Sequence, residues 1–384
     1  MGDARWFATC ARGIEPVLAG ELAALGAARV TAVRAGCQFD GSPALAWRAC
    51  LELRTASRVL QPIAAFAAPD AAALYDGARA VPWEEHLGGP ERTFAVHAAA
   101  HDSAIAHTHF AALKTKDAVA DRLRERWGAR PDVDARDPDV AIFLRLDRDE
   151  ATLSLDLCGE SLHRRGYRPP GPEAPLKETL AAACVALTGW SGDVPLVDPM
   201  CGSGTLLLEG ALAAARVAPG LLRLRAGGRF GLQRWPGHDT AAFEAIVAEA
   251  RARVRPITAA IEGSDRDDRA LALARRGEEL AGPPVTGALR WTVRALEDAA
   301  PPAGAPPGVL LVNPPYGERL GRAEDLGPLY ATLGDVLKRR FTGWTAHVLA
   351  GAPALAKQIG LRPARRVPLW NGAIECRLLR FDLY

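Results

Sequence analysis

A short loop that could act on an amino nitrogen follows an apolar run at 309–312 and reads Asn313-Pro314-Pro315-Tyr316. The apolar run predicts a buried strand, which would place the loop at the carboxyl end of that strand. An amino group conjugated to a base is a poor nucleophile because its lone pair is delocalised into the ring. A catalyst for such a group must therefore hold its two hydrogens and orient its lone pair.

The loop contains the groups that this task requires. The Asn313 side-chain oxygen and the Pro314 carbonyl could accept hydrogen bonds from both amino hydrogens. Pro314 and Pro315 would keep these acceptors in place, and Tyr316 could stack on an unstacked base. The four residues therefore predict methyl transfer to an amino nitrogen, and a proline-rich turn without a function is the less favoured alternative.

A glycine-containing segment lies between a strand expected at 195–198 and a helix expected at 205–217. Gly202 and Gly204 would let its backbone turn tightly and approach a ligand, and amides at the start of the helix could receive a carboxylate. Leu207 stands where the dinucleotide fingerprint has its third glycine, so the spacing favours S-adenosylmethionine (AdoMet) over NAD. A glycine turn without a ligand is the alternative. The predicted AdoMet-binding residues of this segment are Asp198, Pro199, Met200, Gly202, Ser203, Gly204 and Thr205.

Two further segments could complete the cofactor pocket. Asp265 ends the next expected strand, where a carboxylate could accept hydrogen bonds from both ribose hydroxyls, whereas Asp267 fits a helix cap better. Lys177, Glu178 and Thr179 open a helix that is expected near the same pocket. A capped helix behind a charged linker explains these last three residues equally well.

Basic residues supply candidate RNA contacts in two other segments. Arg164, Arg165 and Arg168 precede a proline-rich stretch and could contact phosphates. Lys114 and Lys116 lie on a long expected helix, where they could form part of an RNA-facing stripe. Acidic residues interleave with the basic ones on that helix, so a solvated face with i,i+4 ion pairs is nearly as well supported.

The composition allows a large folded protein with little net charge. The chain has 384 residues, which suits two or three domains, and its 47 basic and 45 acidic side chains give a net charge of +2. An RNA partner would therefore need a local basic face. The seven cysteines form no C-x-x-C pair and the histidine spacing fits no metal motif, so we expect neither a disulfide framework nor a bound metal. No apolar run has the length of a signal peptide or of a membrane span, so we expect a cytoplasmic protein. A monomer is a separate expectation, which no motif in the sequence decides.

The pattern of expected elements divides the chain into four parts. Residues 1–55 and 56–160 each read as an α+β region, and 161–175 reads as a linker because it contains a run of prolines. In 176–384, strands alternate with helices, which predicts an α/β fold with a mostly parallel sheet covered on both faces. Within this last part, the Gly/Arg/Trp-rich stretch 218–238 is expected to be a loop.

With these motifs described, the sequence resembles the THUMP-domain methyltransferases of the ribosomal RNA large-subunit methyltransferase L type. The most specific matching segments are 198–205 and 313–320. The other matching segments are 7–13, 114–118, 163–167, 177–182 and 370–372. The resemblance therefore extends over nearly the whole chain, although some relatives carry a second methyltransferase domain that we do not expect here.

The resemblance implies a ferredoxin-like region at 1–55, a THUMP RNA-binding domain at 56–160 and a Rossmann-like methyltransferase domain at 176–384. It implies AdoMet as the cofactor, a base flipped into the site, and methylation of N2 of a guanine in 23S ribosomal RNA. Similar proteins often place an acid that contacts adenine after the third strand. Here the aligned position is Arg294, and Glu297 or Asp298 could take its place.

Two alternatives to this function stay open at the level of sequence. The first is the same chemistry on a guanine N2 of transfer RNA or on an adenine N6, because the Asn-Pro-Pro-Tyr motif serves several amino nitrogens. The second is a non-catalytic RNA-binding factor for ribosome assembly. Such a factor would keep the basic faces but would need neither Asn313 nor the glycine segment, so their joint presence favours an enzyme.

Overall fold

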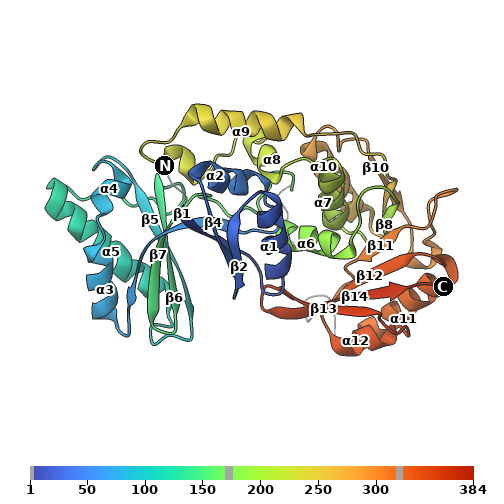
Figure 1. Cartoon of the computed structure of the whole chain (residues 1–384). Helices are drawn as coiled ribbons and strands as arrows, with labels where there is room; N and C mark the ends of the chain where they lie inside the picture. The colour runs from blue at the N-terminus through green and yellow to red at the C-terminus, as the bar shows by residue number, and fades with distance from the viewer. Residues whose placement is uncertain (1–3, 169–175, 317–322) are drawn as a thin grey trace.

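The computed structural model describes residues 4–168, 176–316 and 323–384. These residues form two mixed α/β units, each built on its own sheet. In Figure 1 the N-terminal sheet lies on the left and the second sheet on the right, and the long helix α9 (Thr240–Ala252) runs along the top of the molecule.

The first sheet is continuous across the boundary that we predict at residue 55. Among the described residues its strands are β1 (Ala4–Thr9), β2 (Ala28–Val33), β3 (Gly36–Gly41), β4 (Arg58–Ala67), β5 (Phe94–His101), β6 (Val140–Asp147) and β7 (Glu150–Asp156). Their order is β2-β3-β1-β4-β7-β6-β5, and β1 pairs with both β3 and β4. The two N-terminal regions therefore share one sheet.

The helices of this part begin where the sequence offers a cap. They are α1 (Glu15–Ala24), α2 (Pro43–Glu52), α3 (Ala71–Ala80), α4 (Trp83–Leu87) and α5 (Thr108–Trp127). The Ser42 hydroxyl accepts a hydrogen bond from Leu45 N at 3.3 Å at the start of α2. The Asp70 carboxylate accepts hydrogen bonds from two backbone amides at the start of α3. Helix α4 is absent from the prediction because its five residues are too few to show a periodic pattern.

The second sheet has the mostly parallel arrangement that the sequence predicts. Among the described residues its strands are β8 (Leu196–Asp198), β9 (Ile261–Asp265), β10 (Leu289–Val293), β11 (Val309–Val312), β12 (Thr345–Ala350), β13 (Arg365–Asn371) and β14 (Ile374–Asp382). Their order is β10-β9-β8-β11-β12-β14-β13. The strands from β10 to β12 in this order pair in parallel, whereas β14 is antiparallel to both β12 and β13.

Helices connect these strands, and one of them replaces a predicted loop. Besides α9, the described connections contain α6 (Glu178–Thr188), α7 (Thr205–Ala214), α8 (Pro219–Arg225), η1 (Gly231–Arg234), α10 (Asp268–Ala281), η2 (Leu296–Asp298), α11 (Ala323–Arg340) and α12 (Pro353–Gln358). The prediction of a loop at 218–238 is wrong, since α8 and η1 lie there. The Arg223 guanidinium is buried and donates to the carbonyls of Cys158, Glu160 and Ser161, so an arginine that suggested a surface loop instead fixes a helix.

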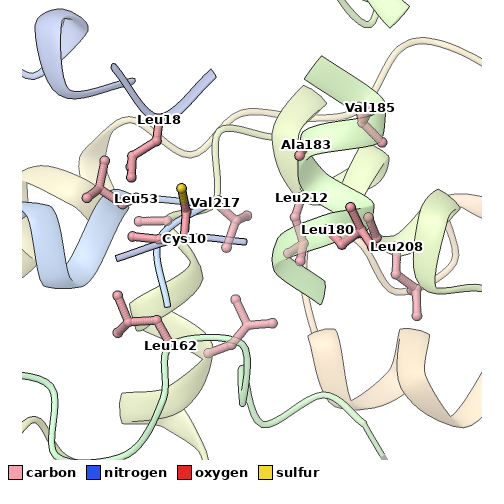
Figure 2. Packing of buried hydrophobic residues seen from close by; sticks show 14 of the residues in the cluster. Cys10, Leu18, Leu53, Leu162, Leu180, Ala183, Val185, Leu208, Leu212 and Val217 are labelled. Carbon is pink, nitrogen blue, oxygen red and sulfur yellow. The ribbon is translucent and has the colours of Figure 1, made fainter. Parts of the chain in front are cut away.

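One hydrophobic core extends across both sheet units. Figure 2 shows Cys10 and Leu53 of the N-terminal region near Val217 of the second unit, and Leu212 beside Leu180 in the same cluster. A separate core lies between α3, α5 and the strands β5, β6 and β7. Another lies between α11 and the strands β11 and β12. The shared core fixes the N-terminal region on the second sheet unit.

Among residues 4–168, 176–316 and 323–384, no single helix is both long and apolar enough to cross a membrane. Helices α7 and α8 reach the required length and composition only together, with a bend of 104° between them. Within the same residues, no three His, Cys, Asp or Glu side chains are grouped in a way that could hold a metal ion.

Candidate active site

The parallel strands bring the predicted site residues to one edge of the second sheet. β8 pairs with β9 through Asp198 and Gly263, and it pairs with β11 through Val197 and Leu310. Because these three strands run in the same direction, their carboxyl ends are neighbours. Asp198, Asp265 and Asn313 each lie at or just after one of these ends.

Hydrogen bonds and close packing fix the glycine loop after β8. Gly202 and Gly204 have φ angles of 52° and 74°, which lie in the left-handed region that favours glycine. Gly202 N donates to Asp265 Oδ2 at 2.9 Å, so the loop is tied to the end of β9. A Cβ at Gly204 would stand 2.6 Å from Trp291 Cη2. At Gly204 the loop backbone therefore lies where a side chain has no room, whereas the space beside Gly202 is open.

The Trp291 side chain behind this loop is itself held in place. Its Nε1 donates to Glu278 Oε2 at 2.6 Å, and its ring would also collide with a Cβ at Gly263. Neither Trp291 nor Glu278 belongs to a motif, so the sequence alone does not mark them as part of the site. Their role is visible in the structure, because the Trp291 ring that Glu278 holds leaves no space for a Cβ at Gly204 or Gly263.

The charges around the loop come from groups that are largely removed from water. Burial raises the pKa of Asp198 well above the ordinary aspartate range, and the nearby Asp265 carboxylate adds to this shift. Burial also raises the pKa of Glu178, while the Arg168 guanidinium opposes that shift. Arg168 Nε lies 3.5 Å from Glu178 Oε1, and its Nη2 donates to Thr205 Oγ1 at 3.3 Å.

These contacts change the interpretation of Arg168. The sequence prediction places it on RNA, whereas the structure places its side chain between the starts of α6 and α7, next to the glycine loop. Glu178 and Thr179 are buried in the same place, and Lys177 is exposed at the N-terminal end of α6. The prolines at 169–172 of the predicted linker lie outside the described residues.

The loop after β11 contains a buried acceptor without a partner. Asn313 Oδ1 is shielded from solvent and has no hydrogen-bond partner among the described residues. A buried amide oxygen without a partner costs on the order of 1–3 kcal/mol, which a ligand that donates to it would recover. Tyr330 donates its hydroxyl to the Pro315 carbonyl at 3.2 Å, which anchors the loop from α11.

The Tyr316 ring is held from two sides. Asn371 Nδ2 donates to the Tyr316 hydroxyl at 3.2 Å, and the ring lies so close to Gly351 that a Cβ there would overlap it. Burial raises the pKa of Tyr316 above its ordinary value, so the hydroxyl stays protonated at neutral pH. The matching segment continues to residue 320, but 317–322 lie outside the described residues.

With this geometry described, comparison with known proteins identifies the family. The model of the RMKL-like methyltransferase domain matches residues 165–380, that of the THUMP domain matches 68–156, and that of the RlmL ferredoxin-like domain matches 5–60. The chain belongs to the RMKL-like methyltransferase family. The resemblance inferred from the sequence and the predicted fold class are therefore both confirmed.

Individual relatives match this family member along its whole length. The ribosomal RNA large subunit methyltransferase K/L of Syntrophotalea carbinolica is 50% identical over 99% of the chain, which covers 53% of that relative. The Synechocystis protein slr0064, provisionally named as an RNA methyltransferase, is 42% identical over 99% of the chain and 97% of its own length. The crystal structure of SMU.472 in complex with S-adenosylhomocysteine has a TM-score of 0.87 and 29% identity, and the match covers 100% of this chain and 99% of that chain. The chain spans about half the length of the first curated K/L relatives that it matches.

The neighbouring residues Arg164 and Arg165, which the sequence predicts to contact RNA, differ in exposure. The Arg164 side chain is 66% exposed and pairs with Glu160 at 2.6 Å. The structure contradicts an RNA contact at Arg165, because its side chain is 1% exposed and all its nitrogens donate to protein atoms. Those acceptors are Glu209 Oε1, the Leu162 carbonyl and the Arg54 carbonyl.

The two lysine candidates lie on α5, as predicted, but each already has a neighbour in the protein. Lys114 Nζ lies 4.8 Å from the centre of the Tyr75 ring, and Lys116 Nζ lies 3.0 Å from a carboxylate oxygen of Asp117. Both side chains are partly exposed, so an RNA contact remains a prediction for them. Arg294 follows β10, and the two acids near it, Glu297 and Asp298, are exposed on η2.

Proposed function

We propose that this protein transfers the methyl group of AdoMet to the exocyclic N2 amino group of a guanine in 23S ribosomal RNA. The proposal rests most directly on the buried oxygen of Asn313, which has no partner among the described residues and lies at the carboxyl end of β11. It is supported by the name of the Syntrophotalea relative, which describes a ribosomal RNA large subunit methyltransferase.

The groups around the glycine loop fit AdoMet in shape and charge. A Cβ at Gly202 would meet no atom within 4 Å, so the space beside this glycine is open for the methionine part of the cofactor, and Asp198 would provide a carboxylate for its ammonium group. Asp265 Oδ1 and Oδ2 each accept one backbone hydrogen bond, and a carboxylate has further lone pairs that can receive ribose hydroxyls. The related SMU.472 structure contains S-adenosylhomocysteine, the product of such a transfer.

The protein would act on the target amino group by orientation. AdoMet, when bound, supplies an electrophilic methyl group on a sulfonium. Asn313 Oδ1 and the Pro314 carbonyl would accept the two amino hydrogens, while the Tyr316 ring supports the base. The nitrogen–carbon bond then forms as the carbon–sulfur bond breaks, and the amino proton leaves to water. Positioning of this kind supplies about 7–11 kcal/mol in favourable cases.

The remaining parts of the proposal concern the RNA and the setting of the reaction. We propose that the THUMP domain, with Lys114 and Lys116, and the exposed Arg164 contact the RNA backbone. The Rossmann-like domain and the N-terminal regions would act together in a monomer. A ribosomal RNA substrate implies that the enzyme works in the cytoplasm.

Transfer of labelled methyl groups tests this proposal directly. Wild-type protein and Asn313→Ala are each incubated with labelled AdoMet and with large-subunit RNA or transfer RNA that lacks the modification, and the nucleosides are identified after digestion. We expect N2-methylguanosine in large-subunit RNA, with a rate about 100-fold to 1,000-fold lower in Asn313→Ala. The dissociation constant for AdoMet serves as the control, and we expect it to change less than about twofold because Asn313 does not hold the cofactor.

The other outcomes distinguish the open alternatives. Labelled transfer RNA or N6-methyladenosine would keep the mechanism and overturn the substrate. An equal rate in wild type and Asn313→Ala would overturn the role of Asn313. A wild-type protein that binds no AdoMet and transfers no methyl group would favour the non-catalytic RNA-binding factor.

A further inference from the structure

The turn between β1 and α1 lies against a strand of the other sheet. Gly13 in this turn has a φ angle of 86°, and a Cβ there would overlap the carbonyl oxygen of Pro368 on β13. Figure 1 shows this end of β13 reaching beneath α1. The approach of the two backbones is therefore so close that only glycine fits, although the two segments are far apart in the sequence.

The residue before this glycine contacts the next part of β13. The guanidinium carbon of Arg12 lies 4.3 Å from the centre of the Trp370 ring, which is the geometry of a cation–π contact. The Arg12 side chain is otherwise exposed, and Trp370 is partly exposed. The N-terminal region thus holds β13 by a backbone contact at Gly13 and a side-chain contact at Arg12.

The same end of β13 holds the candidate catalytic loop. Asn371 follows Trp370 directly and donates from Nδ2 to the Tyr316 hydroxyl at 3.2 Å. β13 is an edge strand of its sheet, and among the described residues it pairs with β14 alone. An edge strand lacks support from a second strand, so the turn around Gly13 supplies support that the sheet does not.

We propose that Arg12 is a positioning residue for the catalytic loop: by stacking on Trp370 it holds Asn371 where the Asn371 amide fixes the Tyr316 ring. This inference rests on the proposed function, since Tyr316 is taken as the ring that supports the target base. Its consequence is that the ferredoxin-like region contributes to the rate of methyl transfer as well as to the binding of RNA. The segments 7–13 and 370–372, which resemble the family at opposite ends of the chain, would then act together to position Tyr316.

An exposed arginine near an RNA-modifying site has an obvious alternative role as a phosphate contact. That role predicts weaker RNA binding and a smaller salt dependence when Arg12 is removed. The positioning role predicts a lower kcat with unchanged RNA binding, because the bound base would be supported less well in the transition state. The two roles therefore move different kinetic constants.

The first experiment measures the Tyr316 ring without any substrate. The chain has five tyrosines, so protein labelled with 3-fluorotyrosine gives few fluorine NMR signals, and Tyr316→Phe assigns the signal of interest. We expect Arg12→Ala and Asn371→Ala to shift or broaden the Tyr316 signal and to leave the others in place. The matched control is Arg145→Ala, which removes a cation–π contact to Phe7, within the N-terminal sheet. A Tyr316 signal that does not respond to Arg12→Ala would overturn the inference.

The second experiment compares kinetic constants on methyl-accepting RNA. We expect Arg12→Ala to lower kcat about 10-fold to 100-fold, while the KM for RNA and the Kd for AdoMet change less than about twofold. Arg12→Lys should restore part of the rate because it keeps a cation over the Trp370 ring. The double variant Arg12→Ala/Asn371→Ala should be no slower than Asn371→Ala alone, because both changes break one chain of contacts.

The outcomes separate this inference from the proposed function. A raised KM with a reduced salt slope in Arg12→Ala would make Arg12 a phosphate contact and overturn the positioning role. Additive losses in the double variant would overturn the linkage to Asn371. Absence of methyl transfer in the wild type would refute the proposed function, whereas the NMR result would still decide whether Arg12 positions Tyr316.

Discussion

Two regions of this molecule bury polar side chains, and they use them in opposite ways. At the carboxyl edge of the second sheet, Asn313 Oδ1 and Glu178 Oε2 are shielded from water without a hydrogen-bond partner among the described residues. At the junction between the two sheet units, the Arg165 guanidinium donates to three protein acceptors, and Glu209 Oε1 accepts from Arg165 and from Tyr167. The open acceptors at the edge lie where the ligand is proposed to bind, whereas the buried charges of the junction contact one another and the backbone of both sheet units.

The junction network connects three segments that border the shared core: the chain around Arg54, the end of α7 and the chain around Arg165. Arg54, which ends the ferredoxin-like region, donates from Nη2 to the carbonyls of Leu212 and Val217 near the end of α7, at 3.1 and 2.8 Å. Its own carbonyl accepts from Arg165, which is the first residue of the segment that matches the methyltransferase domain. Helix α7 begins at the glycine loop and ends on this network. Glu209 Oε2 and Arg54 Nη1 of this network also lack a partner among the described residues, so an open hydrogen bond alone does not mark a site. The comparison teaches that the place of the open acceptor decides: Asn313 lies where parallel strands end, whereas Glu209 lies against a buried arginine.

Replacing the adjacent residues Arg165 and Arg164 one at a time should give the largest difference in the free energy of unfolding, because one is part of the junction and the other is exposed. Arg165→Ala leaves Glu209 buried without its cation, so we expect the free energy of unfolding to fall by about 3–5 kcal/mol. Arg164→Ala removes an exposed ion pair and should change it by less than about 0.5 kcal/mol. Urea unfolding followed by circular dichroism measures both.

A double variant sharpens this prediction. Arg165→Met combined with Glu209→Gln removes both charges and keeps an acceptor for the Tyr167 hydroxyl, so we expect it to be clearly more stable than Arg165→Ala. An Arg165→Ala protein as stable as Arg164→Ala would show that the buried network contributes little. In that case the contrast between the junction and the sheet edge would lose its energetic basis.

At the sheet edge, the expected effect is on activity instead of stability. Gly351→Ala would place a Cβ inside the space of the Tyr316 ring, so the ring must move, and we expect kcat for methyl transfer to fall about 10-fold or more. The Kd for AdoMet should stay nearly constant because Gly351 is not at the glycine loop. Methyl-transfer kinetics with RNA give both constants.

Gly20→Ala is the matched control, because Gly20 lies in α1 and no atom stands within 4 Å of the added Cβ. It should leave activity unchanged and raise the free energy of unfolding by up to about 1 kcal/mol through helix propensity. Equal activity in Gly351→Ala and wild type would mean that the position of the Tyr316 ring does not limit the reaction.

The sequence predicts much of this arrangement and misses the parts that depend on burial. Strand and helix order, the mostly parallel sheet and the joint position of Asp198, Asp265 and Asn313 follow from apolar periodicity and from motifs at strand ends. Spacing cannot show whether an arginine lies in water or in the core, so the sequence predicts RNA contacts for Arg165 and Arg168 although both side chains bind protein groups.

The residues that support the site from behind are also missed, for a related reason. Trp291 and Tyr330 act by packing and hydrogen bonding across long sequence separations, and nothing local marks them. Asn371 stands in a segment that matches the family, but its partner Tyr316 is 55 residues away. One sequence shows which residues could react, and the tertiary structure decides which ones support them.

The smallest effect we predict concerns the pH dependence of AdoMet binding at the sheet edge. Burial raises the pKa of Asp198, so its carboxylate gains a proton at a higher pH than an exposed aspartate would. The carboxylate attracts the ammonium group of AdoMet only in its ionised form, so affinity should fall as pH is lowered through the raised pKa. Calorimetric titration at a series of pH values above the ordinary aspartate pKa of about 3.9 measures this change, since an exposed aspartate stays ionised there. Asp198→Asn should bind AdoMet more weakly than wild type at the upper end of the pH range, and its affinity should change less with pH. Parallel profiles in the two proteins would mean that the titrating group is elsewhere, and the buried Glu178 beside Arg168, whose pKa is also raised, would be the next residue to replace.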